Sequence, residues 1–128
     1  MSSKLRILVV EDEGAILRAA ERVLRGAGYE VRTAASGEDA LLLLSQGAFE
    51  LDLLLVDVVM PGVGGREVAQ AVLARWPGAR VIYMSGYTDD AEVLRGVLDQ
   101  QVDFMGKPFT PTQLLGRVAE VLGREKSK

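Results

Sequence analysis

The sequence predicts an α/β domain in which a parallel sheet of five strands is covered by helices on both faces. Two observations support this prediction: five short apolar runs alternate with five helical patterns along the 128 residues, and four of the runs end in polar side chains. Such alternation is typical of a parallel sheet, because each connection between parallel strands crosses over one face. No linker interrupts the pattern. We therefore expect residues 1–128 to form one domain, with a core over about residues 4–123 and a polar C-terminal tail.

The first strand, the first helix and the second strand are each predicted by a different pattern. Residues 5–10 form a run of mostly branched apolar side chains, typical of a strand buried on both faces. Apolar side chains then recur at helical spacing over residues 16–27, and Gly26 and Gly28 predict the end of that helix. Residues 29–33 alternate apolar and polar side chains, which indicates a half-exposed strand at an edge of the sheet.

The middle of the chain repeats this order. Ser36, three residues before Asp39, resembles a capping box that opens a helix through the leucines at 41–44. Residues 53–56 form a second apolar run, which predicts another fully buried strand. A helical stripe over residues 68–76 follows and is closed by a Pro-Gly pair.

The last third of the chain supplies two more strands and two more helices. Residues 81–84 and 102–105 are the fourth and fifth apolar runs, and a helical pattern over 91–98 lies between them. The final helix opens on Thr110 as N-cap, with a proline at the first helical position and a capping-box glutamine, and it extends to Leu122.

The composition excludes several kinds of chemistry. The chain has no cysteine and no histidine, which rules out disulfides, thiolate or histidine metal sites, a Ser-His-Asp triad and a phosphohistidine within this chain. Its net charge of −3 gives no basic surface for nucleic acid. No signal peptide is visible, and no apolar run approaches the ~20 residues of a membrane span. We therefore expect a cytoplasmic protein that neither binds nucleic acid directly nor inserts into a membrane.

Polar side chains follow the four strongly apolar strands: Glu11 and Asp12, Asp57, Ser85 and Lys107. Ligands of parallel α/β sheets bind beyond the carboxyl ends of the strands, so these side chains predict one site. Each alone has a simpler explanation, as a helix cap, a turn or a solvated lysine. Asp57 is the hardest to explain in that way, because a buried bare carboxylate costs several kcal/mol and has to be paired or bound to a metal.

The charges of these residues indicate a metal and a phosphoryl group. If the first and third strands are neighbours, Glu11, Asp12 and Asp57 share one pocket, and two carboxylates ~4 Å apart repel by ~4 kcal/mol at an effective dielectric of 20. Lys107 and one divalent cation neutralise the three charges, and oxygen ligands favour Mg²⁺. Magnesium, a lysine and a small hydroxyl are the groups that stabilise phosphoryl transfer. Without histidine or cysteine, Asp57 is the expected nucleophile.

Four segments of the chain carry a family resemblance. They are Val9–Glu13, Leu55–Gly62, Met84–Tyr87 and Phe104–Phe109. With them, the sequence resembles the receiver domain of two-component response regulators over nearly its whole length. The resemblance implies a flavodoxin-like, doubly wound fold with five parallel strands in the order 2-1-3-4-5.

The resemblance also implies a role for each site residue. Asp57 resembles the phospho-acceptor and Lys107 the lysine that binds the phosphate. Asp12 resembles the direct Mg²⁺ ligand, Glu11 a ligand acting through water, and the Val59 backbone carbonyl a further ligand. The implied donor is a phosphohistidine of a histidine kinase or phosphotransfer protein, on a separate chain or on the same longer chain. Such a domain catalyses its own phosphorylation and dephosphorylation and is not a conventional enzyme.

The resemblance further implies a conformational switch. Ser85 resembles the switch hydroxyl and Phe104, near the end of the fifth strand, the aromatic switch. Together they change the surface formed by the fourth helix, the fifth strand and the fifth helix. The chain departs from the commoner pattern at four positions: Glu11 replaces Asp, Ser85 replaces Thr, Gly86 replaces Ala and Phe104 replaces Tyr. None of these changes removes an essential group. The implied Lys107-Pro108 bond is cis.

Two segments, 83–90 and 107–110, most resemble receivers fused to hybrid sensor histidine kinases, although a stand-alone receiver fits as well. Two other classes of protein fit the sequence less well. A magnesium-dependent phosphohydrolase usually has a second Asp two residues after the nucleophile, where this chain has Val59. A flavin or nucleotide carrier cradles phosphate in the loop after the first strand, but here that loop is acidic and repels phosphate.

Overall fold

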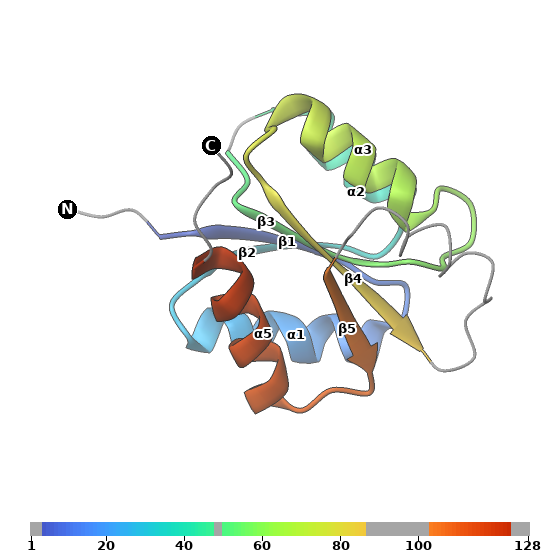
Figure 1. Ribbon diagram of the computed structural model, residues 1–128. Coiled ribbons are helices and arrows are strands. Elements are labelled where there is room, and N and C mark those ends of the chain that lie inside the picture. Colours follow the sequence, from blue (N-terminus) through green and yellow to red (C-terminus); the bar gives the residue numbers. More distant parts are fainter. Residues whose placement is uncertain (1–3, 48–49, 87–102, 124–128) are drawn as a thin grey trace.

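The computed structural model describes residues 4–47, 50–86 and 103–123, and its single sheet has five parallel strands in the order β2-β1-β3-β4-β5 (Figure 1). The strands are β1 (Arg6–Val10), β2 (Glu30–Ala34), β3 (Leu53–Asp57), β4 (Arg80–Gly86) and β5 (Asp103–Lys107). The helices are α1 (Gly14–Gly26), α2 (Gly37–Ser45), α3 (Gly65–Arg75) and α5 (Pro111–Gly123). The α/β class and the strand order are confirmed. The helix expected over 91–98 lies outside the described residues.

Helices cover both faces of the sheet. α1 and α5 pack together on one face, and α2 and α3 on the other (Figure 1). Ile7 and Val9 of β1 therefore face the core under α1 and α5, whereas Leu8 and Val10 face the core under α2 and α3. Burial on both faces explains why β1 and β3 are unbroken apolar runs. None of the described helices is both long enough and apolar enough to cross a membrane.

Two helices begin at the caps that the sequence predicts. The Ser36 hydroxyl oxygen accepts a hydrogen bond from the Asp39 N–H at 3.0 Å, at the start of α2. At the start of α5, the Gln113 N–H donates to the Thr110 hydroxyl oxygen at 3.1 Å, and the Thr110 N–H donates to the Gln113 side-chain oxygen at 2.9 Å. This reciprocal pair satisfies two backbone donors that the first turn of a helix leaves without partners.

The fourth and fifth strands extend beyond their apolar runs. Both continue two residues past these runs, so that Ser85 pairs with Gly106, and Gly86 pairs with Lys107. The strands thus end in the polar and glycine residues that follow the apolar runs, because backbone pairing in a parallel ladder does not require apolar side chains. Phe104 is consequently the second residue of β5, near its beginning rather than near its end as predicted.

The segment between β3 and α3 returns close to the sheet. The Val58 N–H donates to the Met84 carbonyl oxygen at 2.9 Å, which extends the contact between β3 and β4 by one residue. A side chain on Gly65, the first residue of α3, would collide with the carbonyl oxygen of Asp57. Glycine therefore allows α3 to start directly beside the end of β3, and this close approach holds the carboxyl edge of the sheet in place.

Candidate functional site

The polar side chains that the sequence singles out converge at the carboxyl edge of the sheet. Val10 of β1 lies opposite Val56 of β3, so the next residues, Glu11 and Asp57, are neighbours. Lys107, the last residue of β5, reaches the same place from the other side of β4. Three strand ends thus bring two acids and one lysine together, as the alternation of strands and helices predicts.

Lys107 bridges the two buried carboxylates. Its Nζ lies 2.8 Å from Asp57 Oδ2 and 3.1 Å from Glu11 Oε1. Both carboxylate side chains are almost completely buried, at 0% exposure for Glu11 and 3% for Asp57, and the lysine is 12% exposed. Buried charges of this kind are stable only when each has a partner, so the lysine and the two acids form one electrostatic unit.

The second oxygen of each carboxylate accepts a backbone hydrogen bond two residues further along the chain. Asp57 Oδ1 accepts from the Val59 N–H at 3.1 Å, and Glu11 Oε2 accepts from the Glu13 N–H at 3.0 Å. Among the described residues, no buried side-chain nitrogen or oxygen lacks a partner. These bonds fix the orientation of both carboxylates before any ligand arrives.

The buried position shifts the proton affinity of Glu11 and Lys107. Burial raises the pKa of Glu11 from 4.5 to about 7; the charge of Asp57 adds to this, whereas the hydrogen bonds from Glu13 and Lys107 oppose it. For Lys107, burial acts to lower the pKa, but the hydrogen bonds and charges of Asp57 and Glu11 outweigh it, so the pKa is raised. Lys107 therefore stays charged at neutral pH, whereas Glu11 titrates near it.

A third carboxylate completes a candidate metal site. Asp12 is exposed, and carboxylate oxygens of Glu11, Asp12 and Asp57 lie within 4.8 Å of one another. Asp12 is not a helix cap, because the N-cap of α1 is Glu13 and makes no side-chain capping bond. Three carboxylates with one lysine leave an excess of negative charge at a partly open edge, and the hard oxygen donors match the preference of Mg²⁺. These residues fit a magnesium ion.

Ser85 and Phe104 lie in the strands beside this cluster. Ser85 is half-buried and follows Met84, which is in register with Asp57. Phe104 packs against the core under α2 and α3, where its ring lies 6.1 Å from the ring of Tyr83, its partner in register across β4 and β5. Phe104 is thus separate from the acidic cluster, although Lys107 of the cluster lies further along the same strand, β5.

Two features of the site were not predicted from the sequence. The first is Tyr83, a buried aromatic residue between the cluster and Phe104 in the ladder; burial raises the pKa of its phenol. Its position inside an apolar run was the only sequence signal. The second is the pair of backbone N–H groups, from Glu13 and Val59, that orient the acids. A carboxylate followed by a tight turn is the signal that predicts such bonds.

The strand order and the acidic edge with its buried lysine together define a receiver-type α/β domain. Comparison with known proteins gives the family: residues 7–119 match the model of the response regulator receiver domain. The chain belongs to this family and is a receiver domain of two-component signalling.

Similar proteins include both kinases and regulators. The chain is 34% identical to the sensor kinase CckA of Brucella abortus over 98% of its own length, and 32% identical to the DNA-binding response regulator MtrA of Mycolicibacterium smegmatis over 96%. It spans 13% of the first relative and 53% of the second.

Solved structures of receiver domains have the same fold. The receiver domain of the hybrid histidine kinase CckA superposes with a TM-score of 0.74 at 36% identity, covering 91% of this chain and 98% of that one. A CheY-like receiver domain protein from Methanospirillum hungatei superposes with a TM-score of 0.82 at 32% identity, covering 94% of this chain and 95% of that one. The Lys107-Pro108 bond is cis, as the family resemblance implies.

Proposed function

We propose that Asp57 accepts a phosphoryl group from a phosphohistidine of a partner protein and that this modification switches the surface of the domain. In this reaction an oxygen of the Asp57 carboxylate attacks phosphorus, the phosphorus–nitrogen bond to the imidazole breaks, and the departing imidazole takes a proton. The product is an aspartyl phosphate. The observation that carries the proposal is the 2.8 Å contact between Lys107 Nζ and Asp57 Oδ2 in a buried position.

Asp57 is better suited to this role than the neighbouring acids. It ends a strand buried on both faces, its carboxylate is held by Lys107 and by the Val59 N–H, and its side chain is nearly inaccessible except from the carboxyl edge. Glu11, with a pKa raised to about 7, is partly protonated at neutral pH and is then a poor nucleophile. Asp12 is exposed and its carboxylate lies close to those of Glu11 and Asp57, so it serves better as a metal ligand.

Asp12, Asp57 and the Val59 carbonyl would bind Mg²⁺ directly, and Glu11 would bind it through water. Bound magnesium would neutralise negative charge on the transferring phosphoryl group. Lys107 would also neutralise negative charge on the phosphoryl group, and it remains charged because its pKa is raised. When Asp57 is phosphorylated, the Lys107 ammonium group can exchange its contact with Asp57 Oδ2 for one with a phosphoryl oxygen. It would stay in the pocket during this exchange, because Glu11 Oε1 also contacts it at 3.1 Å.

Ser85 and Phe104 are the proposed switch. A phosphoryl group on Asp57 adds about −1.5 to −2 charges and three acceptor oxygens at the edge of the sheet. Ser85, one residue beyond the register partner of Asp57, would donate its hydroxyl to the phosphate. Phe104 would then turn from its contact with Tyr83 toward the vacated space. The altered surface comprises β5, α5 and the helix expected over 91–98.

The Val59 side chain and Tyr87 would determine the lifetime of the phosphate. Val59 is 42% exposed beside Asp57, and Tyr87 lies outside the described residues. Both side chains are bulky and would shield the acyl phosphate from water. Dephosphorylation by the domain itself would then be slow.

The setting of this reaction is proposed from the relatives. One is a sensor kinase and another a DNA-binding regulator, and the chain covers only part of each. We place the domain in the cytoplasm, either as the receiver of a hybrid histidine kinase or as a stand-alone response regulator, and expect it to have no direct contact with nucleic acid. We propose that residues 1–128 form one domain that catalyses its own phosphorylation and dephosphorylation.

The proposed function is tested with acetyl phosphate and Mg²⁺ as the phosphoryl source. Intact-mass analysis should show one added phosphoryl group, which hydroxylamine removes. Asp57→Asn should remain unmodified, whereas Asp39→Asn, a matched change of an exposed acid on α2, should be modified like the wild type. Equal labelling of Asp57→Asn and the wild type would overturn the proposal.

A further inference from the structure

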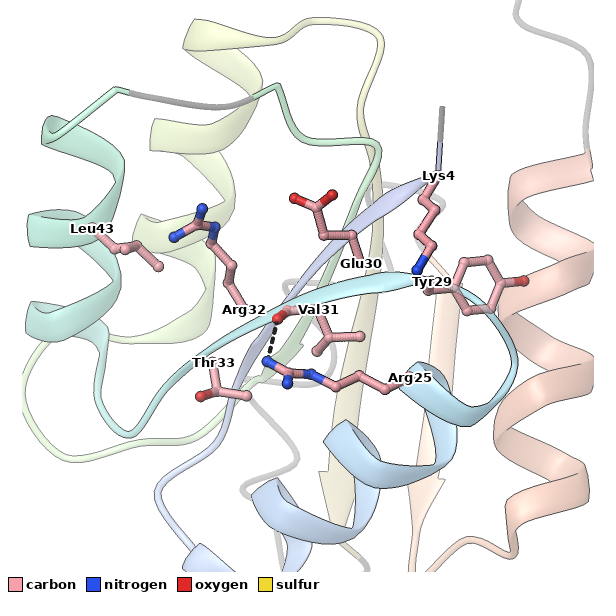
Figure 2. A pocket seen from close by; sticks show the side chains of 8 residues that line it. All are labelled: Lys4, Arg25, Tyr29, Glu30, Val31, Arg32, Thr33 and Leu43. Carbon is pink, nitrogen blue, oxygen red and sulfur yellow. Dashed lines mark hydrogen bonds between the residues drawn. The ribbon is translucent and has the colours of Figure 1, made fainter. Parts of the chain in front are cut away.

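An open groove runs along the outer side of β2, at the opposite edge of the sheet from β5. Its volume is about 560 Å³. Figure 2 shows its walls: Arg25 and Tyr29 come from the end of α1 and the turn after it, Arg32 from β2 itself, and Leu43 from α2. The groove contains none of the residues of the acidic cluster and is therefore a separate feature of the surface.

The floor of this groove is the outer backbone edge of β2, the strand at one end of the described sheet. The Glu30 N–H donates to the Leu5 carbonyl oxygen at 2.9 Å, and the Ala34 carbonyl oxygen accepts from the Glu11 N–H at 3.2 Å. Even-numbered residues of β2 thus direct their backbone groups toward β1. Because neighbouring residues of a strand direct these groups to opposite sides, Val31 and Thr33 direct theirs into the groove.

One of these outward groups, the Val31 carbonyl oxygen, already accepts a hydrogen bond from a side chain. A terminal nitrogen of Arg25 donates to the Val31 carbonyl oxygen at 3.0 Å (Figure 2), and the same nitrogen lies 2.9 Å from Glu21. The Arg25 side chain is 59% exposed, so it can move away without uncovering a core. A carboxylate brought to the groove can draw the guanidinium from the carbonyl oxygen, which then becomes available to a backbone N–H.

The charge of the groove indicates what binds there. Lys4, Arg25 and Arg32 line it together with a single acid, Glu30, although the whole chain carries a net charge of −3. A second copy of this chain would bring the same excess of basic side chains to this edge, which is unfavourable. An acidic partner would be attracted by the same side chains.

We propose that the groove binds an extended acidic segment of a partner protein as an added strand on β2. The segment pairs its backbone with Val31 and Thr33. Its side chains alternate between the α2 side, where Arg32 and Leu43 lie, and the α1 side, where Arg25 lies. Carboxylates fit Arg25 and Arg32, and an apolar side chain fits Leu43.

The proposal is tested with a short synthetic peptide that alternates glutamate and valine, titrated into the protein of residues 1–128. Amide signals of Val31 and Thr33 should shift, and their hydrogen exchange should slow. A lysine-valine peptide should not bind. Arg32→Glu should raise the dissociation constant roughly tenfold, because it replaces attraction of the peptide's carboxylates by repulsion. The control Arg66→Glu, an exposed arginine on α3, should leave the constant unchanged.

A second version of the peptide separates strand addition from simple charge attraction. N-methylation of its backbone removes the N–H groups and retains the charge, so this version should bind far more weakly. Equal binding of the two versions would overturn the proposal in favour of a site for any anion. Shifts at β5 instead of β2, or self-association through β2 in the absence of peptide, would also overturn it.

Discussion

The raised pKa of Glu11 predicts an unusual dependence of stability on pH in the metal-free protein. The folded protein holds the Glu11 proton up to about pH 7, whereas a carboxyl group in the unfolded chain loses it near the ordinary value of 4.5. Between these values the folded state binds more protons. The free energy of unfolding contributed by this group therefore falls as the pH rises from 4.5 to 7. The difference corresponds to about 3 kcal/mol, at 1.36 kcal/mol for each pKa unit.

The substitution Glu11→Gln isolates this contribution. The single side-chain oxygen of glutamine can replace only one of the two carboxylate oxygens, so one of the hydrogen bonds from the Glu13 N–H and from Lys107 is lost at every pH, and glutamine does not titrate. We expect the stability of Glu11→Gln relative to the wild type to increase by up to about 3 kcal/mol between pH 5 and pH 8, because only the wild type carries this titrating group. Lys107 does not create this slope, because its pKa is raised and its contribution is present throughout the range. Glu13→Gln, at an exposed neighbouring acid, is the matched control and should be close to the wild type.

The assay is urea denaturation in the presence of a chelator, at several pH values between 5 and 8.5. Saturating Mg²⁺ should reduce the difference between the wild type and Glu11→Gln, because the cation stabilises the charged form of the site. Parallel pH profiles for the two proteins would refute the reasoning from burial.

Five further substitutions have expected outcomes. Lys107→Ala leaves two buried carboxylates without their cation and should destabilise the metal-free protein by about 3–5 kcal/mol in urea denaturation; a change below the error would show that the pair is not buried. Asp12→Asn should lose most of the Mg²⁺-dependent increase in stability, which for the wild type is about 2.7 kcal/mol at one hundred times the dissociation constant; an unchanged increase would exclude Asp12 as a ligand. Gly65→Ala should be destabilising by about 1–3 kcal/mol, because the new methyl group meets the carbonyl oxygen at the end of β3. Gly116→Ala, in open space on α5, should instead stabilise by about 0.5–1 kcal/mol, and equal effects of the two would contradict the packing described here. Val59→Asn should release phosphate faster than the wild type in a phosphate assay, and an unchanged rate would exclude shielding.

The sequence predicted the architecture because its strongest signals are periodic. Unbroken apolar runs at β1 and β3 encode strands buried on both faces, and the polar residues that follow them mark the carboxyl edge. The caps at Ser36 and Thr110 were predicted because their hydrogen bonds join residues three apart in the chain. Hydrogen bonds between residues so close in the chain can be predicted without knowing the rest of the fold.

The parts that were missed depend on register or on residues far apart in the chain. The pairing of Ser85 with Gly106 across β4 and β5 depends on register, which no side-chain pattern encodes. The contact of Tyr83 with Phe104 depends on the same register. Lys107 was expected to offset one negative charge, but that it bridges Glu11 and Asp57 is a property of the folded sheet, in which three strand ends meet.

The central claim is that Asp57 is the residue that carries the phosphoryl group. Reduction of an acyl phosphate with borohydride converts the modified aspartate into homoserine, which marks its position permanently. The protein, phosphorylated with Mg²⁺ present, should yield homoserine at position 57 alone when its peptides are sequenced by mass spectrometry. Homoserine at position 12, or an acid-stable phosphate on a hydroxyl side chain, would contradict the account.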